Sequence, residues 1–438
     1  MKILLILVMA FCVNVSLQAE EARPLELTVD AAVEMALENN ADYLISEQEV
    51  RQSKARLRQN LGFLPQVTLE GTKTLDEKLM EIEIAYGENG ETQKAILDFT
   101  MDYEFTFQVV QPIFSGGKIF FNLKNAGLDV KIAKEKFKLA HAQLKVDVQK
   151  AFYNILVMKE LLSAHRESLK LAKSNLESVA ERFHLGLVPK FDLLRAELSV
   201  ASVKPNLLKI EKLLKLSHLK LKAMIGVPPE TAVKVIGELS RPSFNQDLED
   251  VSRDASTRNS QVVQMNMQVK KAANLLKIAY GQFLPDISLA ASYSYRSNLF
   301  KLNKDNWEDY YTIALGVKFP IFTGLKRSGR IGELYVNKKI TELRRKKVDD
   351  QTRLLIQDLY MTIQEEYENI NAGLKNVEMA SEGVKMAESA YKEGLISILE
   401  LNQSNTELIK AKVNYIQALY NYNIAVAEIK KASGSYRD

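Results

Sequence analysis

The sequence predicts a mainly α-helical fold with an internal duplication and a small set of amphipathic strands between the helices. Three observations lead to this prediction. The 438 residues include only 19 Gly and 10 Pro, a composition typical of long helices. Apolar residues recur at helical spacing through two long stretches, 118–185 and 326–393. Short sequence motifs of the first half of the chain recur in the second half, which indicates an internal repeat.

The N-terminus, MKILLILVMAFCVNVSLQAEEA, has the pattern of a secretory signal peptide. Lys2 precedes an unbroken apolar run from Ile3 to Val13, which is too short to cross a bilayer as a helix. A suitable cleavage site follows at Ala19. We therefore expect residues 1–19 to be a signal peptide that is removed on export.

Cysteine content, charge and motifs exclude several classes of protein. Cys12 is the only cysteine, so we expect no disulfide and no thiol metal site in the mature chain. Phe11 stands where a lipoprotein has a small residue, so lipidation is not expected. The net charge of +4 gives no indication of a nucleic-acid partner. No metal-ligand spacing, phosphate loop or nucleophile elbow occurs, so we expect neither an enzyme nor a cofactor.

Three pairs of matching motifs define the repeat. GFLPQVTLEG at 62–71 matches QFLPDISLAA at 282–291, and VQPIFSGGK at 110–118 matches KFPIFTGLK at 318–326. The bend at Gly186 matches Gly394, which lies 208 positions later. We expect structural repeat 1 over residues 20–236 and structural repeat 2 over residues 237–438.

Between the prolines of these motifs, the spacing of apolar residues changes from the helical period to a period of two residues. MDYEFTFQV at 101–109 alternates apolar with polar residues, and so do three further stretches. This predicts four strands, within about 65–112 and about 285–320. Proline neither continues a helix nor donates to a central ladder. We therefore expect it at the helix–strand junctions, namely at Pro65, Pro112, Pro285 and Pro320.

The strand pattern fits either a transmembrane β-barrel or a soluble sandwich, and the signal peptide and long helices favour the barrel. The polar segments 74–98 and 297–309 are then expected to be extracellular connectors. Aromatic residues near the second segment are expected to form an interfacial girdle; these are Tyr293, Tyr295, Trp307, Tyr310 and Tyr311. Four strands leave unpaired edges in lipid, so oligomers are expected, and three copies would supply about twelve strands.

Each half is predicted to carry a long antiparallel helical hairpin. The first spans about 118–224 with its bend at 186, and the second spans about 326–432 with its bend at 394. Apolar residues at alternating spacings of three and four form a coiled-coil seam along both. Glycine at each bend provides the positive φ that a tight reversal needs. Shorter helices are expected at about 29–61 and 250–280.

The two-fold repeat, the FLP and PIF junctions and the Gly-Leu bends together resemble the TolC-type outer-membrane efflux family, over essentially the whole mature chain. The resemblance implies a homotrimer with a twelve-stranded β-barrel in the outer-membrane lipid of a Gram-negative cell. It also implies a long helical tunnel, an α-barrel, in the periplasm. The function implied is a passive duct of a tripartite efflux or type I secretion system. Its partners would be a periplasmic membrane-fusion adaptor and an inner-membrane pump of the RND, ABC or MFS type.

The same resemblance makes the bends candidates for adaptor docking, with six residues involved: Gly186, Leu187, Val188, Gly394, Leu395 and Ile396. Asp192 and Glu400 occupy positions where the family has acids around the periplasmic constriction, which makes them candidate gate residues. Alternatively, both acids only stabilise helix N-termini. The alternative function is a soluble periplasmic coiled-coil scaffold or adaptor. The exported substrate is not encoded in any motif of this chain.

Overall fold

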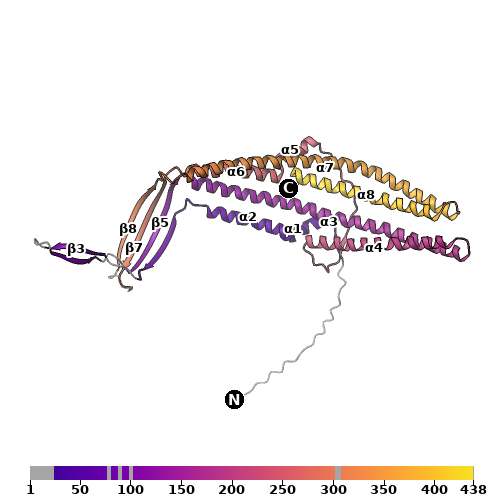
Figure 1. Ribbon diagram of the computed structural model, residues 1–438, viewed down its shortest axis with the longest axis horizontal. Coiled ribbons are helices and arrows are strands. Elements are labelled where there is room, and N and C mark those ends of the chain that lie inside the picture. Colours follow the sequence, from indigo (N-terminus) through magenta and orange to yellow (C-terminus); the bar gives the residue numbers. More distant parts are fainter. Residues whose placement is uncertain (1–23, 76–79, 87–90, 98–101, 301–306, 438) are drawn as a thin grey trace, which may run out of the picture. The chain divides into compact units, whose positions relative to one another are not determined.

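The computed structural model describes residues 24–75, 80–86, 91–97, 102–300 and 307–437 (Figure 1). The predicted signal peptide therefore lies outside the described residues. The fold is mainly helical with a small content of strands, as predicted. In chain order the elements are β1 (Leu25–Leu27), α1 (Val29–Asn39), α2 (Ala41–Gln59), β2 (Gln66–Lys73), β3 (Met80–Tyr86), β4 (Glu91–Leu97), β5 (Tyr103–Ser115), α3 (Lys118–His184), α4 (Lys190–Met224), β6 (Val233–Val235), α5 (Leu248–Arg258), α6 (Ser260–Gly281), β7 (Asp286–Ser297), β8 (Glu308–Lys318), α7 (Lys326–Lys392), α8 (Ile398–Ser433) and the 3-10 turn η2 (Ser435–Arg437).

The chain divides into two compact units. The first consists of Met1–Leu44, Ala140–Val251 and Ile356–Asp438, and the second consists of Ile45–Leu139 and Ser252–Leu355. Helices α3 and α7, each of 67 residues, contribute to both units.

In the first unit, α4 runs back along α3 and α8 runs back along α7 (Figure 1). Their apolar stripes form the core. Phe152 and Ile155 of α3 and Leu221 of α4 are almost completely buried, together with Ala32 and Ala36 of α1. Helices of this length need a partner along their course because intrinsic helix propensity alone does not stabilise them. The antiparallel pairing provides that partner.

The expected single helices at 29–61 and 250–280 are each divided in two, so that prediction was wrong in detail. The side chain of Asn40 accepts hydrogen bonds from the amides of Asp42 and Tyr43. Asn259 does the same with the amides of Gln261 and Val262. Each asparagine therefore begins a new helix, α2 or α6, since an N-cap side chain replaces the missing intrahelical partners.

The second unit contains an antiparallel four-stranded sheet in the order β2-β5-β7-β8. Its central register pairs Phe107 of β5 with Tyr293 of β7, and Tyr293 with Tyr311 of β8. These strands coincide with the four amphipathic segments predicted from the period of two. The outer strands β2 and β8 each have only one partner among the described strands.

The segment 74–98 was expected to be a polar connector, and this prediction was wrong. Strands β3 and β4 form an antiparallel hairpin there, with Met80 opposite Leu97 and Tyr86 opposite Glu91. The sequence MEIEIAY of β3 alternates in the same way as the other strands. Residues 87–90 and 301–306 lie outside the described residues.

A two-stranded parallel sheet in the first unit was not predicted. Strand β1 pairs with β6, with Leu25 opposite Val233 and Leu27 opposite Val235. Each strand has only three residues, which is too short for an alternating pattern to stand out in the sequence. Leu27 and Val235 are buried in the core formed by α1, α3 and α4.

Candidate functional site

The bends at Gly186 and Gly394 have the same backbone geometry. Gly186 has φ of 74° and Gly394 has φ of 75°. The amide of Leu187 donates to the carbonyl of Arg182 at 2.9 Å, and the amide of Leu395 donates to that of Ala390 at 2.9 Å. These are Schellman helix ends, in which the residue with positive φ is glycine.

The glycines are needed for their backbone conformation alone. A Cβ atom added to Gly186 or Gly394 would meet no heavy atom within 4 Å. The left-handed conformation is what an L side chain would resist. The surroundings of both bends are therefore open.

Large apolar side chains stand exposed at both bends. Leu187 is 70% exposed and Leu395 is 72% exposed, whereas Val188 and Ile396 are half-buried. Ile396 packs against a small cluster of Ala387, Ile398 and Leu401. Each bend therefore presents one exposed leucine beside a half-buried aliphatic residue.

The two candidate gate acids are held differently. The carboxylate of Glu400 accepts from the amide of Ser397 at 2.7 Å, and the amide of Glu400 donates back to the hydroxyl of Ser397. These bonds to Ser397 lower the pKa of Glu400. Asp192 lies in the first turn of α4, whose N-cap is Pro189 and has no side-chain cap bond. Glu400 thus closes a capping box, and Asp192 does not.

The structure adds a contact between the two helical hairpins that the sequence reasoning missed. The guanidinium of Arg182 in α3 lies 5.5 Å from the ring centre of Tyr391 in α7. Burial raises the pKa of Tyr391; the charge of Arg182 opposes this shift and the charge of Asp192 adds to it. No spacing rule in the sequence pointed to this contact.

Three of the four repeat-matched prolines lie between a helix and a strand. Pro65 immediately precedes β2, Pro285 immediately precedes β7, and Pro320 lies between β8 and α7. Pro112 differs from the expectation, because it lies inside β5 at a register shift with β7. A proline is tolerated there because a bulge interrupts the ladder that would need its amide.

The FLP and PIF motifs meet in space within the second unit. The side-chain amide of Gln111 donates to the carbonyl of Phe63 at 2.8 Å. In the second copy the guanidinium of Arg327 donates to the carbonyls of Gln282 and Pro320. These contacts connect the start of one strand with the end of its neighbour in each copy.

Of the five aromatic residues expected to form an interfacial girdle, Tyr310 lies on the opposite, polar face of the sheet, across from Ser294, where its hydroxyl donates to Glu104. The other four do not share that face. Tyr295 stacks on Trp307 with ring centres 5.8 Å apart, and Tyr293 lies 6.0 Å from Tyr295. The apolar residues of β8 are also exposed, with Ile313 at 69% and Leu315 at 66%. This sheet therefore presents an apolar face with aromatic residues towards one end.

A comparison with known families decides the identity. The sequence pattern of the family described as "Outer membrane efflux protein" matches residues 32–227 and 251–435. This chain belongs to the outer membrane efflux protein family. The resemblance stated from the sequence is confirmed, and with it an efflux function in the outer membrane. The family match does not favour the alternative of a soluble periplasmic scaffold.

Solved structures share the fold of this outer membrane efflux protein. The outer membrane protein VceC of Vibrio cholerae aligns with 93% of this chain and 96% of its own, at a TM-score of 0.77 and 17% identity. The CmeC outer membrane channel of Campylobacter jejuni aligns with 93% of this chain and 85% of its own, at a TM-score of 0.79 and 16% identity. The MtrE outer membrane channel of Neisseria gonorrhoeae, solved in an open state, aligns with 93% of this chain and 88% of its own, at a TM-score of 0.73 and 15% identity. No curated protein matches the sequence significantly.

Within the described ranges, no helix combines the length and apolarity that crossing a membrane requires. In the same part of the chain, no three His, Cys, Asp or Glu side chains are grouped as metal ligands would be.

Proposed function

We propose that three copies of this chain form one closed duct, with four strands from each copy in a twelve-stranded barrel. The observation that carries this proposal is the sheet. Its edge strands β2 and β8 are exposed along their whole length and have no outer partner among the described strands. In lipid, unpaired backbone groups are costly, so each edge needs a strand from a neighbouring copy.

The proposed duct is built from an internal duplication, with residues 20–236 as the first repeat and residues 237–438 as the second. Several spacings support it. Helices α3 and α7 begin at Lys118 and Lys326, and α4 and α8 begin at Lys190 and Ile398, a displacement of 208 in both cases. Two matching hairpins in each of three copies would give twelve helices around a periplasmic tunnel, an α-barrel. Residues 1–19 would serve as the signal peptide that directs export.

The duct would be the passive outer component of a tripartite efflux or type I secretion system. The exposed leucines at the two bends, Leu187 and Leu395, support docking of a periplasmic membrane-fusion adaptor there. Gly186 and Gly394 would keep both docking loops in one shape. An inner-membrane pump of the RND, ABC or MFS type would supply energy and substrate selection.

Reconstitution tests the central proposal. The processed chain, purified in detergent, should run as a trimer and give single-channel conductance in planar bilayers. A water-soluble monomer without conductance would contradict the proposal. The measurement depends on assembly and not on any identified substrate.

Asp192 and Glu400 are proposed to line the periplasmic constriction of this duct. Changing both, as Asp192→Asn with Glu400→Gln, should reduce cation selectivity or increase leakage of the closed state, because rings of acids attract cations. Reversal potentials and basal currents in planar bilayers measure the two effects.

A matched variant separates the gate from the helix cap. Ser397→Ala removes the capping hydroxyl that bonds Glu400 and leaves the carboxylate in place. Currents of the Ser397→Ala protein should stay close to wild type. If Ser397→Ala changed the currents as much as the double neutralisation, or if the double variant changed nothing, capping alone would explain both acids.

A further inference from the structure

Four helices of the second unit join the sheet near the same end of it (Figure 1). Asp286 at the start of β7 lies opposite Ser115 at the end of β5 and opposite Lys318 at the end of β8. Gln66 at the start of β2 lies opposite Val110 of β5. Because the strands are antiparallel, the ends of α2 and α6 and the beginnings of α3 and α7 all meet this end.

Contacts between the helices make these junctions neighbours. Arg56 of α2 lines one cavity together with Ala126 of α3 and Gln268 of α6. The guanidinium of Arg327, near the start of α7, donates to the carbonyl of Gln282 at the end of α6 at 3.0 Å. The four junctions therefore form one surface. We call it the junction belt, and it consists of residues 53–64, 116–128, 270–285 and 319–332.

The junction belt is basic throughout. Its four segments contain eleven Lys or Arg and no Asp or Glu, whereas the whole chain has 59 Lys or Arg and 55 Asp or Glu. At the opposite end of the sheet acids outnumber bases among the described residues, with Asp102, Glu104, Glu308 and Asp309 beside Lys73 and Arg296. A surface of one sign attracts a partner of the opposite sign, so the belt is suited to an anionic partner.

Most cations of the belt are not neutralised within the chain. Three acids that adjoin the belt each neutralise one of its cations, in the pairs Lys118–Asp286, Lys271–Asp129 and Arg330–Glu333. The other eight cations form no ion pair with any residue that the structure describes. Their charge is therefore available to a partner outside the chain.

Two of these unpaired cations lie on one pair of aromatic rings. The ammonium of Lys124 in α3 lies 5.9 Å from the ring centre of Phe120, and that of Lys277 in α6 lies 5.4 Å from the ring centre of Phe121. The two rings pack edge-on, with centres 5.2 Å apart. Both lysines are exposed, so their N–H groups point to no acceptor that would prevent contact with an anion.

Large apolar side chains of the belt are exposed beside these cations. Phe120 is 62% exposed. Others are exposed as well, namely Phe63, Leu64, Phe283, Leu284, Phe322 and Leu325. Aromatic rings and long cationic side chains together are typical of a membrane–water interface, because each has an apolar part and a polar part.

Positions along the helices place the cations at one depth. With a rise of 1.5 Å per residue, Lys124 lies about 9 Å from the start of α3, and Lys277 lies about 6 Å from the end of α6. Strands β7 and β8 have 12 and 11 residues, enough to cross the hydrocarbon core of a bilayer. Since each headgroup region is about 5–8 Å thick, a sheet in lipid would set both lysines at headgroup level.

We propose that the junction belt binds anionic phospholipids of the leaflet on the helical side of the sheet, with Lys124 and Lys277 as the main contacts to the phosphate. The inference rests on the proposed placement of the sheet in lipid. The ammonium groups donate to phosphate oxygens, and the exposed rings contact the adjoining methylene groups of the acyl chains. A zwitterionic lipid binds more weakly, because its own ammonium offsets the charge of its phosphate.

Native mass spectrometry of the full-length protein in detergent tests the proposal. Phosphatidylglycerol and phosphatidylethanolamine with identical acyl chains are titrated separately, and we expect phosphatidylglycerol to bind about tenfold more tightly. Each lysine at a lipid surface contributes about fivefold in affinity. Lys124→Gln with Lys277→Gln should therefore weaken binding of phosphatidylglycerol about ten- to thirtyfold and leave phosphatidylethanolamine little changed. Equal affinities of the two lipids for the wild-type protein would overturn the proposal.

A matched variant removes the same charge elsewhere on the protein. Lys346 and Lys347 of α7 are exposed and lie about 30 Å along the helix from its first residue. Lys346→Gln with Lys347→Gln should bind phosphatidylglycerol as the wild type does. Equal losses in the two double variants would mean that net charge alone sets the affinity, which contradicts a specific belt.

A soluble phosphate distinguishes a lipid surface from a phosphate site. Glycerol phosphate at millimolar concentration should not displace bound phosphatidylglycerol, because it lacks the acyl chains that contact the rings. Displacement of the lipid by glycerol phosphate would overturn the assignment to a lipid surface.

Photolabelling covers the case in which the double variant does not fold. Vesicles that contain wild-type protein and a photoactivatable phosphatidylglycerol are irradiated, and labelled peptides are mapped by mass spectrometry. Labels should lie in the junction belt, and labels confined to other segments would overturn the proposal. A benzophenone amino acid in place of Lys277 should label lipid, and crosslinks to sister subunits instead would equally contradict it.

Conductance and oligomeric state are measured on the same preparations. A protein that conducts as a trimer but binds both lipids equally contradicts the belt and not the duct. A protein that selects phosphatidylglycerol but neither forms trimers nor conducts contradicts the duct and not the belt.

Discussion

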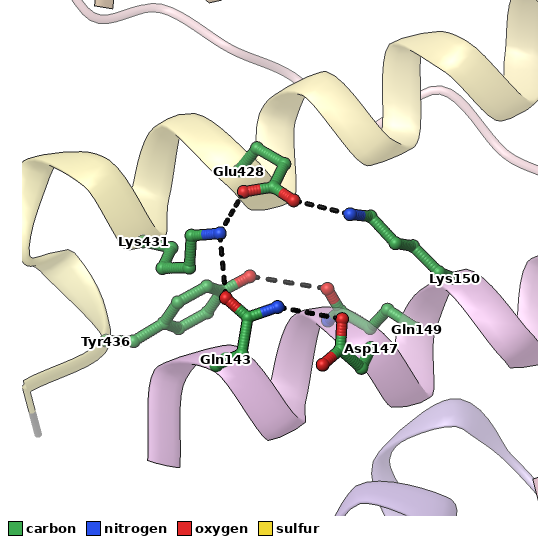
Figure 2. Close-up of polar contacts among 7 residues, drawn as sticks. All are labelled: Gln143, Asp147, Gln149, Lys150, Glu428, Lys431 and Tyr436. Atoms are coloured by element: carbon green, nitrogen blue, oxygen red, sulfur yellow. Dashed lines mark hydrogen bonds and ion pairs between the residues drawn. The ribbon is translucent and has the colours of Figure 1, made fainter. Parts of the chain in front are cut away.

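At the scale of single residues, a charged cluster connects the end of α8 with α3 (Figure 2). The carboxylate of Glu428 accepts hydrogen bonds from Lys150 of α3 and from Lys431 of its own helix. Lys431 also donates to Gln143 at 3.0 Å. Burial opposes ionisation of Glu428, but the two lysines outweigh it and lower its pKa below its ordinary value. Nearby, burial raises the pKa of Tyr436 to about 12, and its hydroxyl donates to Gln149 of α3.

The lowered pKa of Glu428 predicts a dependence of stability on pH. A carboxyl group with a lowered pKa in the folded state stabilises the protein above its ordinary pKa, and this contribution is lost as the pH falls through the folded value. Glu428→Gln should cost about 1–3 kcal/mol at pH 7 and little at the lowest pH. Thermal unfolding followed by circular dichroism from pH 7 to pH 3 measures the difference.

The control for Glu428 is an exposed ion pair of the same helix. Glu407 pairs with Lys410 at 2.9 Å, and both side chains are more than half exposed. Such pairs contribute about 0–1 kcal/mol, so Glu407→Gln should have little effect at any pH. Equal melting curves for the two variants would mean that the Glu428 cluster does not stabilise the first unit.

At the scale of elements, two glycines allow the end of α6 to meet the turn between β5 and α3. A Cβ atom added to Gly116 would lie 2.1 Å from the carbonyl oxygen of Gly281, and one added to Gly281 would lie 2.0 Å from that of Gly116. Gly116 also has φ of 59°. The GGK sequence after the first PIF motif is therefore required by backbone contact as well as by conformation.

Gly116→Ala should destabilise the second unit by about 3 kcal/mol or more, because left-handed strain and overlap with backbone add together. Gly127→Ala is the matched control within α3. Its added Cβ meets nothing within 4 Å, so the variant should be slightly more stable, by about 0.5–1 kcal/mol. Fluorescence of Trp307, the only tryptophan, follows unfolding in urea. Similar midpoints for both variants would refute the close contact.

At the scale of the whole molecule, the proposed barrel assigns the two faces of β8 to different surroundings. Leu315 belongs to the apolar face and Thr312 to the polar face of the same strand. Leu315→Arg would place a charge in lipid at a cost of about 2–4 kcal/mol near the bilayer midplane. Thr312→Arg would face the water-filled interior and should be tolerated. The yield of heat-resistant trimers in outer-membrane fractions measures the effect, and equal yields would contradict the assignment of the faces.

Some of this architecture could be predicted because its signals are local and long. The apolar seam of α3 and α7 extends over many turns, and the Gly-Leu bends carry their own helix ends. The β3–β4 hairpin was missed because polar residues in MEIEIAY and its flanks gave the segment the composition of a loop. Strands β1 and β6 have three residues each, and the division at Asn40 depends on side-chain hydrogen bonds within an otherwise helical pattern.

The sequence by itself determined the helices, the two bends, the alternating strands and the family, because each depends on periodicity or on a conformation that only glycine adopts readily. Only the tertiary structure decided which distant groups meet. It placed Arg182 beside Tyr391, Gly116 against Gly281, and β6 beside β1. These contacts join residues far apart in the chain, and their energies depend on distances that no local pattern encodes.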